Sequence, residues 1–403
     1  METLDGILAK YVAQGDDTRD KLLGAAFVVV DSNKILYEGS AGRTSIPSNS
    51  PPFTASSFTW VASCSKIITI PAILTLVERG LFSLDSDVRP LLPELAGLRI
   101  LRSFNPTSGA PILKDSDTEI TLRHLLTHTA GLSYDIADMD LEKWSKFIGR
   151  TDRNLHHTLA GWTTPLKFTP GRGWRYGTSI DWAAQVVERV TGQTIGTYLE
   201  ENILRPLGMA DTTFHSTSKP HLDKAGCTLR DRRTGSLQMC PLPVPLEPPV
   251  ESAGAGLWTT GRDHARMLRA LLSISSGQEE GGVLKKETVD EMFRPQLNDI
   301  QRASLQDRVN FRHNTMIPEF PPGTMVQHGI GGLMNVEDVP GKRRAGSMQW
   351  MGMANSHWWI DRETGIAATL IVNIDPFPDA VVIKLYDELE RAVYGELLAE
   401  LRK

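Results

Sequence analysis

The sequence predicts a mixed α/β (α+β) protein with an antiparallel sheet built from both ends of the chain. Strand patterns occur at residues 25–37 and again at 346–375, whereas residues 81–215 carry mostly helix and loop patterns. The simplest assembly joins the two strand regions in one sheet, flanked by terminal helices, with the middle segment inserted as a helical lobe. We therefore expect an α/β domain from 1–80 and 216–403 and a helical domain from 81–215.

The N-terminal region supplies the first helix and the first strands. Residues 25–37, AAFVVVDSNKILY, predict a hairpin: an apolar run, a polar turn and a second short strand. Before it, Leu4, Ile7, Leu8 and Tyr11 share one face of a predicted amphipathic helix.

A strongly apolar helix is predicted to begin at Ser63 and to end at Gly80. Pro71 lies inside it and should kink it or distort one turn, because proline lacks the backbone donor. Residues 216–250 are proline-rich and should be extended, and the late strands should turn around 362–365. Further helices are predicted at 118–132, 179–192, 194–208, 261–273 and 378–403.

Composition narrows the class of protein. The 403 residues are 40% hydrophobic and 23% charged, with a net charge of −5, which is ordinary for a globular chain. No long basic run suggests a nucleic-acid partner, and no apolar stretch is long enough to span a bilayer. The three cysteines, Cys64, Cys227 and Cys240, are too few for a disulfide scaffold. Without a secretion signal, they indicate a cytoplasmic protein.

The stretch ASCSKII at 62–68 places Ser63 three residues before Lys66. Such residues lie on one helical face, and burial disfavours the charged ammonium form, so Lys66 could serve as a base for Ser63. The N–H of a residue in the first helical turn is also free to bind an oxyanion. Alternatively, Ser63 merely caps the helix and Lys66 extends toward solvent; these residues alone favour neither interpretation.

Cys64, Ser65 and a second Ser-x-x-Lys sequence are alternatives to Ser63 as the nucleophile. Cys64 and Ser65 point about 100° and 200° around the helix from Ser63, away from the shared face. Cys64 is interpreted as a small buried residue, although a thiol nucleophile with a histidine partner remains an alternative. The second Ser-x-x-Lys, at 216–219, lies in a polar loop and is interpreted as surface.

A second site element lies at 170–182, PGRGWRYGTSIDW, where Tyr176 precedes a predicted helix. A tyrosine there could share a proton with a lysine and relay it to a leaving group, or it could be an ordinary buried tyrosine. His124 and His128 have the spacing of a zinc-protease pair, but Leu125 stands where that motif needs glutamate. We expect neither a metal nor another cofactor.

Several motifs occur in a characteristic order: Ser63-x-x-Lys66, LRHLLTHTAGL (122–132), PGRGWRYG (170–177), LRPLGMADTTF (204–214), GAGLWTTGRDHARML (254–268) and WMG (350–352). In this combination the chain strongly resembles the serine β-lactamase-like family over about residues 20–390. That family includes class C β-lactamases, penicillin-binding D-peptidases, esterases and acyltransferases. The resemblance is greatest to the fungal acyltransferase branch of lovastatin biosynthesis, and it implies an active site between the two domains.

The resemblance also implies roles for particular residues. Ser63 would form a covalent acyl-enzyme, Lys66 would be the base that activates it, and Tyr176 would be the proton partner. The oxyanion hole would consist of the backbone N–H groups of Ser63 and Met353.

Two departures from the lactamase pattern bear on the substrate. Thr178 replaces an asparagine, and Trp350-Met351-Gly352 replaces the Lys-Thr-Gly whose lysine supplies positive charge for a substrate carboxylate. We therefore expect an aliphatic or polycyclic acyl donor or acceptor in an apolar cleft rather than an anionic antibiotic or cell-wall peptide. The expected substrate-binding residues are Trp350, Met351, Gly352, Trp174, Thr178 and Trp258.

The sequence thus predicts a serine acyltransferase of secondary metabolism. It would move an acyl group from a thioester or ester donor through acyl-Ser63 to a small-molecule hydroxyl or amine, and an acyl-carrier domain of a polyketide synthase is a candidate partner. The alternative is a carboxylesterase of small or natural-product esters with the same three residues. A β-lactamase, a D-peptidase or a non-catalytic binding protein is less favoured, and no nucleic-acid or membrane partner is expected.

Overall fold

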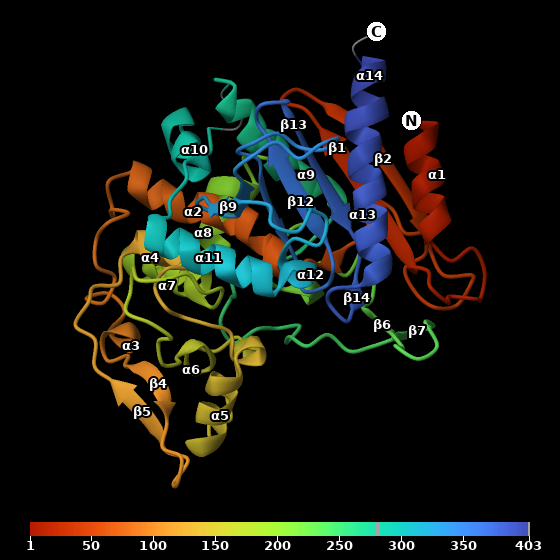
Figure 1. Ribbon diagram of the computed structural model, residues 1–403. Helices are drawn as coiled ribbons and strands as arrows, with labels where there is room; N and C mark the ends of the chain where they lie inside the picture. Colours follow the sequence, from red (N-terminus) through yellow and green to blue (C-terminus); the bar gives the residue numbers. More distant parts are fainter. Residues whose placement is uncertain (279–281, 402–403) are drawn as a thin grey trace.

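The computed structural model describes residues 1–278 and 282–401 and contains a seven-stranded antiparallel sheet (Figure 1). The strand order is β2-β1-β13-β12-β11-β10-β9. The strands span Gly24–Val30 (β1), Ile35–Gly42 (β2), Val326–His328 (β9), Leu333–Asn335 (β10), Met348–Met351 (β11), His357–Asp361 (β12) and Ile366–Ile371 (β13). Because β1 pairs with β13, the two ends of the chain form one sheet, and the predicted fold class is confirmed.

Strand β1 shows why this sheet is buried on both faces. All seven residues of its sequence, GAAFVVV, are buried. Side chains alternate between faces along a strand, so Ala26, Val28 and Val30 join one hydrophobic core while Phe27 and Val29 join another. Helices must therefore cover both faces.

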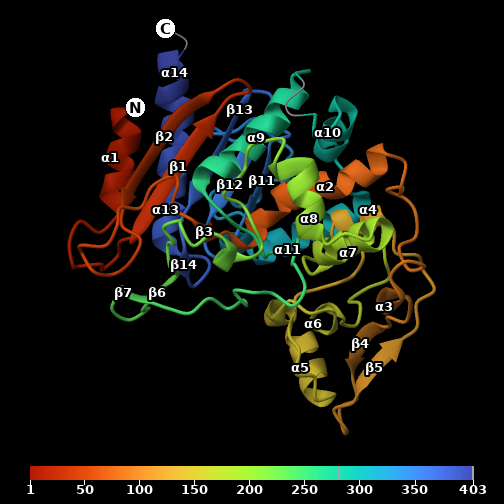
Figure 2. The ribbon, with the colours of Figure 1, turned by 180° about the vertical axis from the view of Figure 1, so that it is seen from behind.

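Two helices near the chain ends cover one face of the sheet, and helices from the interior of the chain cover the other. Helices α1 (Glu2–Tyr11) and α13 (Ala380–Ala392) contact each other beside β2 (Figure 1). Helix α9 (Gly261–Ser275) packs against β1 and β13 on the opposite side, as the reverse view shows (Figure 2). Helix α2 (Lys66–Glu78) contacts α9 and is apolar all round, as expected of a helix buried on every side.

The inserted region is less helical than predicted. It contains a two-stranded hairpin, and the helix expected over 118–132 is reduced to five residues. Thr121 caps that helix, and the left-handed His128, with φ of 58°, prevents it from continuing to Gly131. The elements here are α3 (Pro93–Ala96), β4 (Ile100–Phe104), β5 (Pro111–Lys114), α4 (Leu122–Leu126), α5 (Met139–Phe147), α6 (Leu159–Trp162), α7 (Ser179–Thr191) and α8 (Ile195–Leu199).

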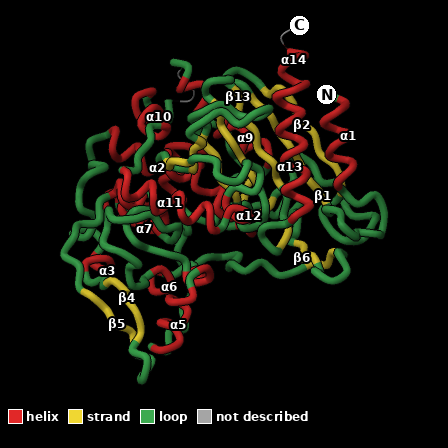
Figure 3. Tube along the Cα trace, in the orientation of Figure 1, coloured by secondary structure: helices red, strands yellow, loops and turns green. Residues whose placement is uncertain are grey.

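Helices α7 and α8 pack against α2, and one hydrophobic cluster continues from the sheet into this region. The domain boundaries at 80/81 and 215/216 therefore stay a prediction. Loops connect most of the remaining short elements (Figure 3). These are β3 (Thr59–Trp60), β6 (Thr228–Arg230), β7 (Leu237–Met239), β8 (Trp258–Thr259), α10 (Lys286–Phe293), α11 (Asp299–Phe311), α12 (His313–Met316), β14 (Ile374–Asp375) and α14 (Leu398–Leu401).

Among the helices of the described residues, none combines the length and the apolar character needed to cross a membrane.

Candidate active site

Ser63 lies in a tight turn immediately before α2. The α-helix was predicted to begin at Ser63, but it begins at Lys66, and residues Ala62–Ser65 form a short 3-10 helix. Ala62 has φ of 47°, a left-handed conformation that costs a non-glycine residue about 1–3 kcal/mol and is common at functional sites. The turn places Ser63 at the wall of a cavity, with 9% of its surface exposed.

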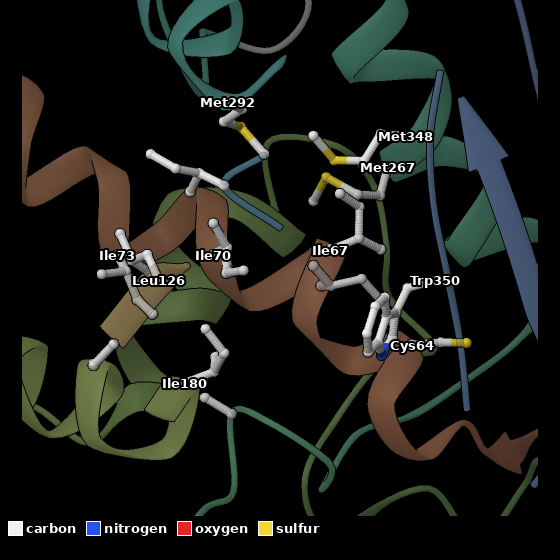
Figure 4. Close-up of a cluster of buried hydrophobic side chains, with 14 of the residues drawn as sticks. Cys64, Ile67, Ile70, Ile73, Leu126, Ile180, Met267, Met292, Met348 and Trp350 are labelled. Carbon is white, nitrogen blue, oxygen red and sulfur yellow. The ribbon is translucent and has the colours of Figure 1, made fainter. Parts of the chain in front are cut away.

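The two residues after Ser63 face the protein interior. Cys64 is fully buried, and that burial raises the pKa of its thiol. Figure 4 shows its side chain beside the apolar cluster that surrounds α2. Ser65 Oγ donates to the carbonyl of Ala62 at 2.6 Å and accepts from the N–H of Leu257 at 3.0 Å. Of these three neighbours, Ser63 alone lines the cavity.

Lys66 is buried close to two tyrosines. Its Nζ donates to the carbonyl oxygen of Gly254 at 2.6 Å and lies 4.7 Å from the ring centroid of Tyr176 and 5.9 Å from that of Tyr134. Within the described chain, no hydrogen bond joins Ser63 Oγ to this Nζ. Such catalytic hydrogen bonds are often long in the absence of substrate and tighten when it binds.

The carbonyl group that holds Lys66 is itself fixed by Asp181. One carboxylate oxygen of Asp181 accepts from the Gly254 N–H at 2.9 Å and from Ser252 Oγ at 2.6 Å. A Cβ at position 254 would lie 2.8 Å from Oδ2 of Asp181, so the close contact between this backbone and the carboxylate requires glycine. Burial raises the pKa of Asp181, an effect that the positive charge of Lys66 and the two hydrogen bonds oppose.

Tyr176 lies in the loop before α7, where the sequence placed it. Its hydroxyl oxygen accepts a hydrogen bond from the indole Nε1 of Trp350 at 3.1 Å. The ring of Tyr176 also stacks on that of Trp174, with an interplanar angle of 16° and 6.5 Å between centroids. The sequence assigned Trp350 only apolar surface and a π-face; its N–H adds a polar contact at the site.

Two buried histidines lie behind Tyr176. The ring centroid of His128 is 4.8 Å from that of Tyr176 and 5.7 Å from that of His328. Burial lowers the pKa of both imidazoles, that of His128 to well below its usual value and that of His328 to about 4. Both are therefore neutral near pH 7 and place no charge against the tyrosine ring.

The backbone N–H groups of Ser63 and Met353 have no hydrogen-bond partner among the described residues. The loop that carries Met353 follows β11 and lies against the Ser63 turn. A Cβ at Gly352 would lie 2.5 Å from the carbonyl oxygen of Val61, so glycine permits this contact. Two unpaired donors in adjacent segments are what an oxyanion hole requires.

The cavity beside Ser63 has a volume of about 220 Å³ and a mostly apolar and aromatic wall. Of the residues predicted from the sequence, the wall contains Ser63, Tyr176, Met353, Trp174, Trp350, Met351 and Gly352.

Two predicted substrate-binding residues lie elsewhere. Thr178 is completely buried at the start of α7, where it directs its hydroxyl toward a backbone carbonyl. Trp258 belongs to β8 and packs on Phe58, with ring centroids 5.5 Å apart. Neither lines the cavity, so we no longer include them in the candidate site.

The model of the β-lactamase family matches residues 5–392. The chain belongs to the β-lactamase family. It is 33% identical to lovastatin esterase of Penicillium rubens over 359 residues, which cover 86% of this chain and 87% of the relative. It is 32% identical to monacolin J acid methylbutanoyltransferase of Aspergillus terreus over 358 residues, covering 86% and 84% of the two chains.

Solved structures agree with these relatives. A variant of simvastatin synthase from Aspergillus terreus superposes with a TM-score of 0.86 at 29% identity, covering 98% of each chain. The protein is thus an enzyme of the β-lactamase fold in a branch that contains acyltransferases and esterases.

Sequence reasoning missed several polar residues of the cavity wall, among them Tyr134, Arg308 and Arg312. Tyr134 is half-buried, and its buried hydroxyl has no hydrogen-bond partner among the described residues. It lies six residues after the left-handed His128, in a loop whose path no periodic pattern predicts. The arginines belong to the region of α11, which carried no recognised motif.

No group of three or more potential metal-ligating side chains occurs in the described ranges 1–278 and 282–401. Of the two helically spaced histidines considered above, His124 accepts from the N–H of Thr121 and so helps to cap α4.

Proposed function

We propose that this enzyme is a serine acyltransferase that moves an acyl group from a thioester or ester donor to a small-molecule hydroxyl or amine. The observation that carries the proposal is the meeting of three features on one apolar cavity. The first is Ser63, and the second is Tyr176, whose ring centroid lies 4.7 Å from Lys66 Nζ and whose hydroxyl accepts from Trp350. The third is a set of two backbone N–H groups without a partner in the described chain, those of Ser63 and Met353. The name of the Aspergillus terreus relative, a methylbutanoyltransferase, supports the same reaction class.

In the first half-reaction, Ser63 Oγ attacks the acyl carbonyl carbon and transfers its proton to Lys66 Nζ. The N–H groups of Ser63 and Met353 donate to the oxyanion of the tetrahedral intermediate. The bond from carbon to the leaving sulfur or oxygen then breaks, and the leaving group receives the proton from Lys66 by way of the Tyr176 hydroxyl. The product is an ester on Ser63.

In the second half-reaction, the acceptor hydroxyl gives its proton to the Tyr176–Lys66 pair and attacks the ester carbonyl of acyl-Ser63. The tetrahedral intermediate collapses, the bond between Ser63 Oγ and the acyl carbon breaks, and Oγ regains a proton. The apolar cavity wall supports transfer over hydrolysis, because a bound acceptor that excludes water protects the ester until it reacts.

Carboxylester hydrolysis is the second candidate, and the 33% identity with lovastatin esterase is the observation that favours it. The chemistry requires the same three side chains, with water in place of the acceptor. The two candidates differ in one measurable quantity, the lifetime of acyl-Ser63 without an acceptor.

Intact-mass measurement tests both candidates. The protein is mixed with acyl thioesters of N-acetylcysteamine, with and without an alcohol or amine acceptor. We expect the wild type to gain one acyl mass that persists until an acceptor is added, whereas prompt loss in water would favour the esterase. Ser63→Ala should gain no mass. Ser216→Ala, from the other Ser-x-x-Lys, is the matched control and should label normally; Ser216 is buried in a short 3-10 helix, not on the surface as predicted. Acylation of the Ser63→Ala variant or of Cys64 would refute the assignment.

The role of Lys66 is tested in the same assay. Lys66→Met keeps the buried stem but removes the amine, so we expect acylation to slow by about 10²–10⁴-fold, the usual contribution of a general base. Lys219→Met, from the other Ser-x-x-Lys, is the matched control and should leave the rate unchanged. A loss of only a few-fold in Lys66→Met would contradict its role as base.

We also propose a cytoplasmic location, domain limits at 80/81 and 215/216, and an acyl-carrier domain that delivers the acyl donor. The three cysteines are free, which supports a reducing compartment such as the cytoplasm. We propose an acyl-carrier domain as the donor's carrier because of the thioester chemistry. Acyl transfer from such a domain, compared with the free N-acetylcysteamine thioester, tests this choice.

A further inference from the structure

Two arginines on the wall of the Ser63 cavity are without a charged partner. Arg308 lies in α11 and Arg312 directly follows that helix, and both line the cavity. The guanidinium of Arg308 makes no ion pair or hydrogen bond with any residue of the described chain. The guanidinium of Arg312 has one long hydrogen bond, 3.5 Å to the carbonyl oxygen of Ala137. Partly buried arginines are rarely left without an anion.

The surroundings add positive charge rather than neutralise it. A third arginine, Arg175, lies nearby and is paired with Asp138 at 3.2 Å, but Asp138 is shared with Lys167 at 3.0 Å. Burial, together with the charges of Arg175 and Arg312, lowers the pKa of Arg308 to about 10. Lys167 also pairs with Asp140 at 2.7 Å, so Lys167 and Arg175 already engage the two nearby carboxylates. Within the described chain, Arg308 and Arg312 are therefore left without an ion pair and repel each other and Arg175 across this part of the cleft.

We propose that Arg308 and Arg312 form an anion subsite that binds an oxyacid group, a carboxylate or a phosphate, of the substrate held in the Ser63 cavity. Arginine forks suit both groups, because paired N–H donors match two oxygens. The wall between the arginines and Ser63 is mostly apolar. The substrate is then an amphiphile with an apolar body and one anionic end. This inference rests on the proposed acyl transfer, since it concerns the same cavity.

The subsite revises the substrate expected from the sequence. The absence of the lactamase lysine at Trp350 argued against an anionic antibiotic or cell-wall peptide and for an aliphatic or polycyclic substrate. The two arginines of the α11 region supply positive charge to the cleft from another side. The favourable interaction of cations with a helix C-terminus, about 0.3–1 kcal/mol, explains an arginine at the end of α11. It does not explain why Arg308 is turned toward the cavity and partly buried beside two further arginines.

Matched substrate pairs test the subsite. One pair carries a distal carboxylate or carboxamide on the acyl group, the second carries the same two groups on the acceptor, and the third compares phosphopantetheine with pantetheine thioesters. We expect Arg308→Gln and Arg312→Gln to lower kcat/KM for the anionic member of one pair by about 10–100-fold, mainly through KM. The pair whose ratio of anionic to neutral kcat/KM falls identifies whether the acyl group, the acceptor or the donor carries the anion.

Arg302→Gln is the control, because Arg302 lies on the same helix but not on the cavity wall. It should leave every ratio of anionic to neutral kcat/KM unchanged. If Arg308→Gln and Arg312→Gln change no ratio, or lower both members of a pair equally, the anion subsite is refuted. Acylation of Ser63 by the neutral substrates is read separately, so failure of the proposed function is distinguishable from failure of the subsite.

Discussion

The indole N–H of Trp350 donates to the hydroxyl oxygen of Tyr176 at 3.1 Å, and the two ring centroids are 4.8 Å apart. The hydrogen bond joins the end of β11 to the loop before α7. It also fixes the direction of the tyrosine O–H, because one lone pair of the oxygen is already used. In the proposed reaction, this donor would stabilise negative charge that forms on the Tyr176 oxygen.

Removing this donor should slow the chemistry without altering the fold. Trp350→Phe keeps an aromatic ring but lacks the N–H, so we expect acylation of Ser63 to slow by about 10-fold, equivalent to about 1.4 kcal/mol. Trp258→Phe is the matched control, because Trp258 lies outside the cavity. Single-turnover release of the leaving group measures the rate, and equal rates for Trp350→Phe and wild type would contradict a role for this hydrogen bond.

Substitution of Gly352, which contacts the Ser63 turn, should also slow the reaction. In Gly352→Ala, the added Cβ would lie 2.5 Å from the carbonyl oxygen of Val61, which must move. We expect kcat to fall by about 10²-fold or more, because the two oxyanion donors separate while substrate contacts remain. In Gly6→Ala, on the exposed face of α1, the Cβ meets nothing within 4 Å and kcat should not change. A normal kcat for Gly352→Ala would contradict the proposed oxyanion hole.

Stability should fall on acidification because buried histidines resist protonation. Burial lowers the pKa of His264 to about 4, against about 6.5 in an unfolded chain. Between these values the unfolded chain binds more protons than the folded one, so folding stability is present above pH 6.5 and is lost toward pH 4. His264 alone should remove about 2 kcal/mol between pH 7 and pH 5.

The variant His264→Leu isolates this effect. Its free energy of unfolding, measured by urea titration, should fall less between pH 7 and pH 5 than that of wild type, by about 2 kcal/mol. Packing changes shift the curve equally at both pH values, so only the difference between them is diagnostic. An identical pH dependence in variant and wild type would show that His264 is not held neutral by the fold.

Much of the fold followed from periodicity. The apolar run AAFVVV and the amphipathic pattern over 261–273 are local signals, and they correspond to β1 and α9. The predicted end of the helix over 118–132 was wrong, because the helix stops before the left-handed His128. That conformation depends on packing rather than on the identity of the residue.

In the candidate site, too, local motifs were predictable from the sequence and contacts between distant segments were not. Ser63 and Tyr176 were found because their motifs are short and contiguous in the sequence. Arg308 was missed because it reaches the cavity only when α11 packs beside the late strands, a contact far apart in the chain. Trp258 was included on composition alone, yet its ring packs on Phe58 and is not part of the cavity wall.

The position of β1 between β2 and β13 has a consequence for synthesis of the protein. The partner strand Ile366–Ile371 leaves the ribosome more than three hundred residues after Gly24–Val30. Until then, one edge of an entirely apolar strand has no permanent partner, and pairings so distant in sequence form slowly. The nascent chain must therefore shelter this strand until Ile366–Ile371 have been made, and the central pairing of the sheet forms late.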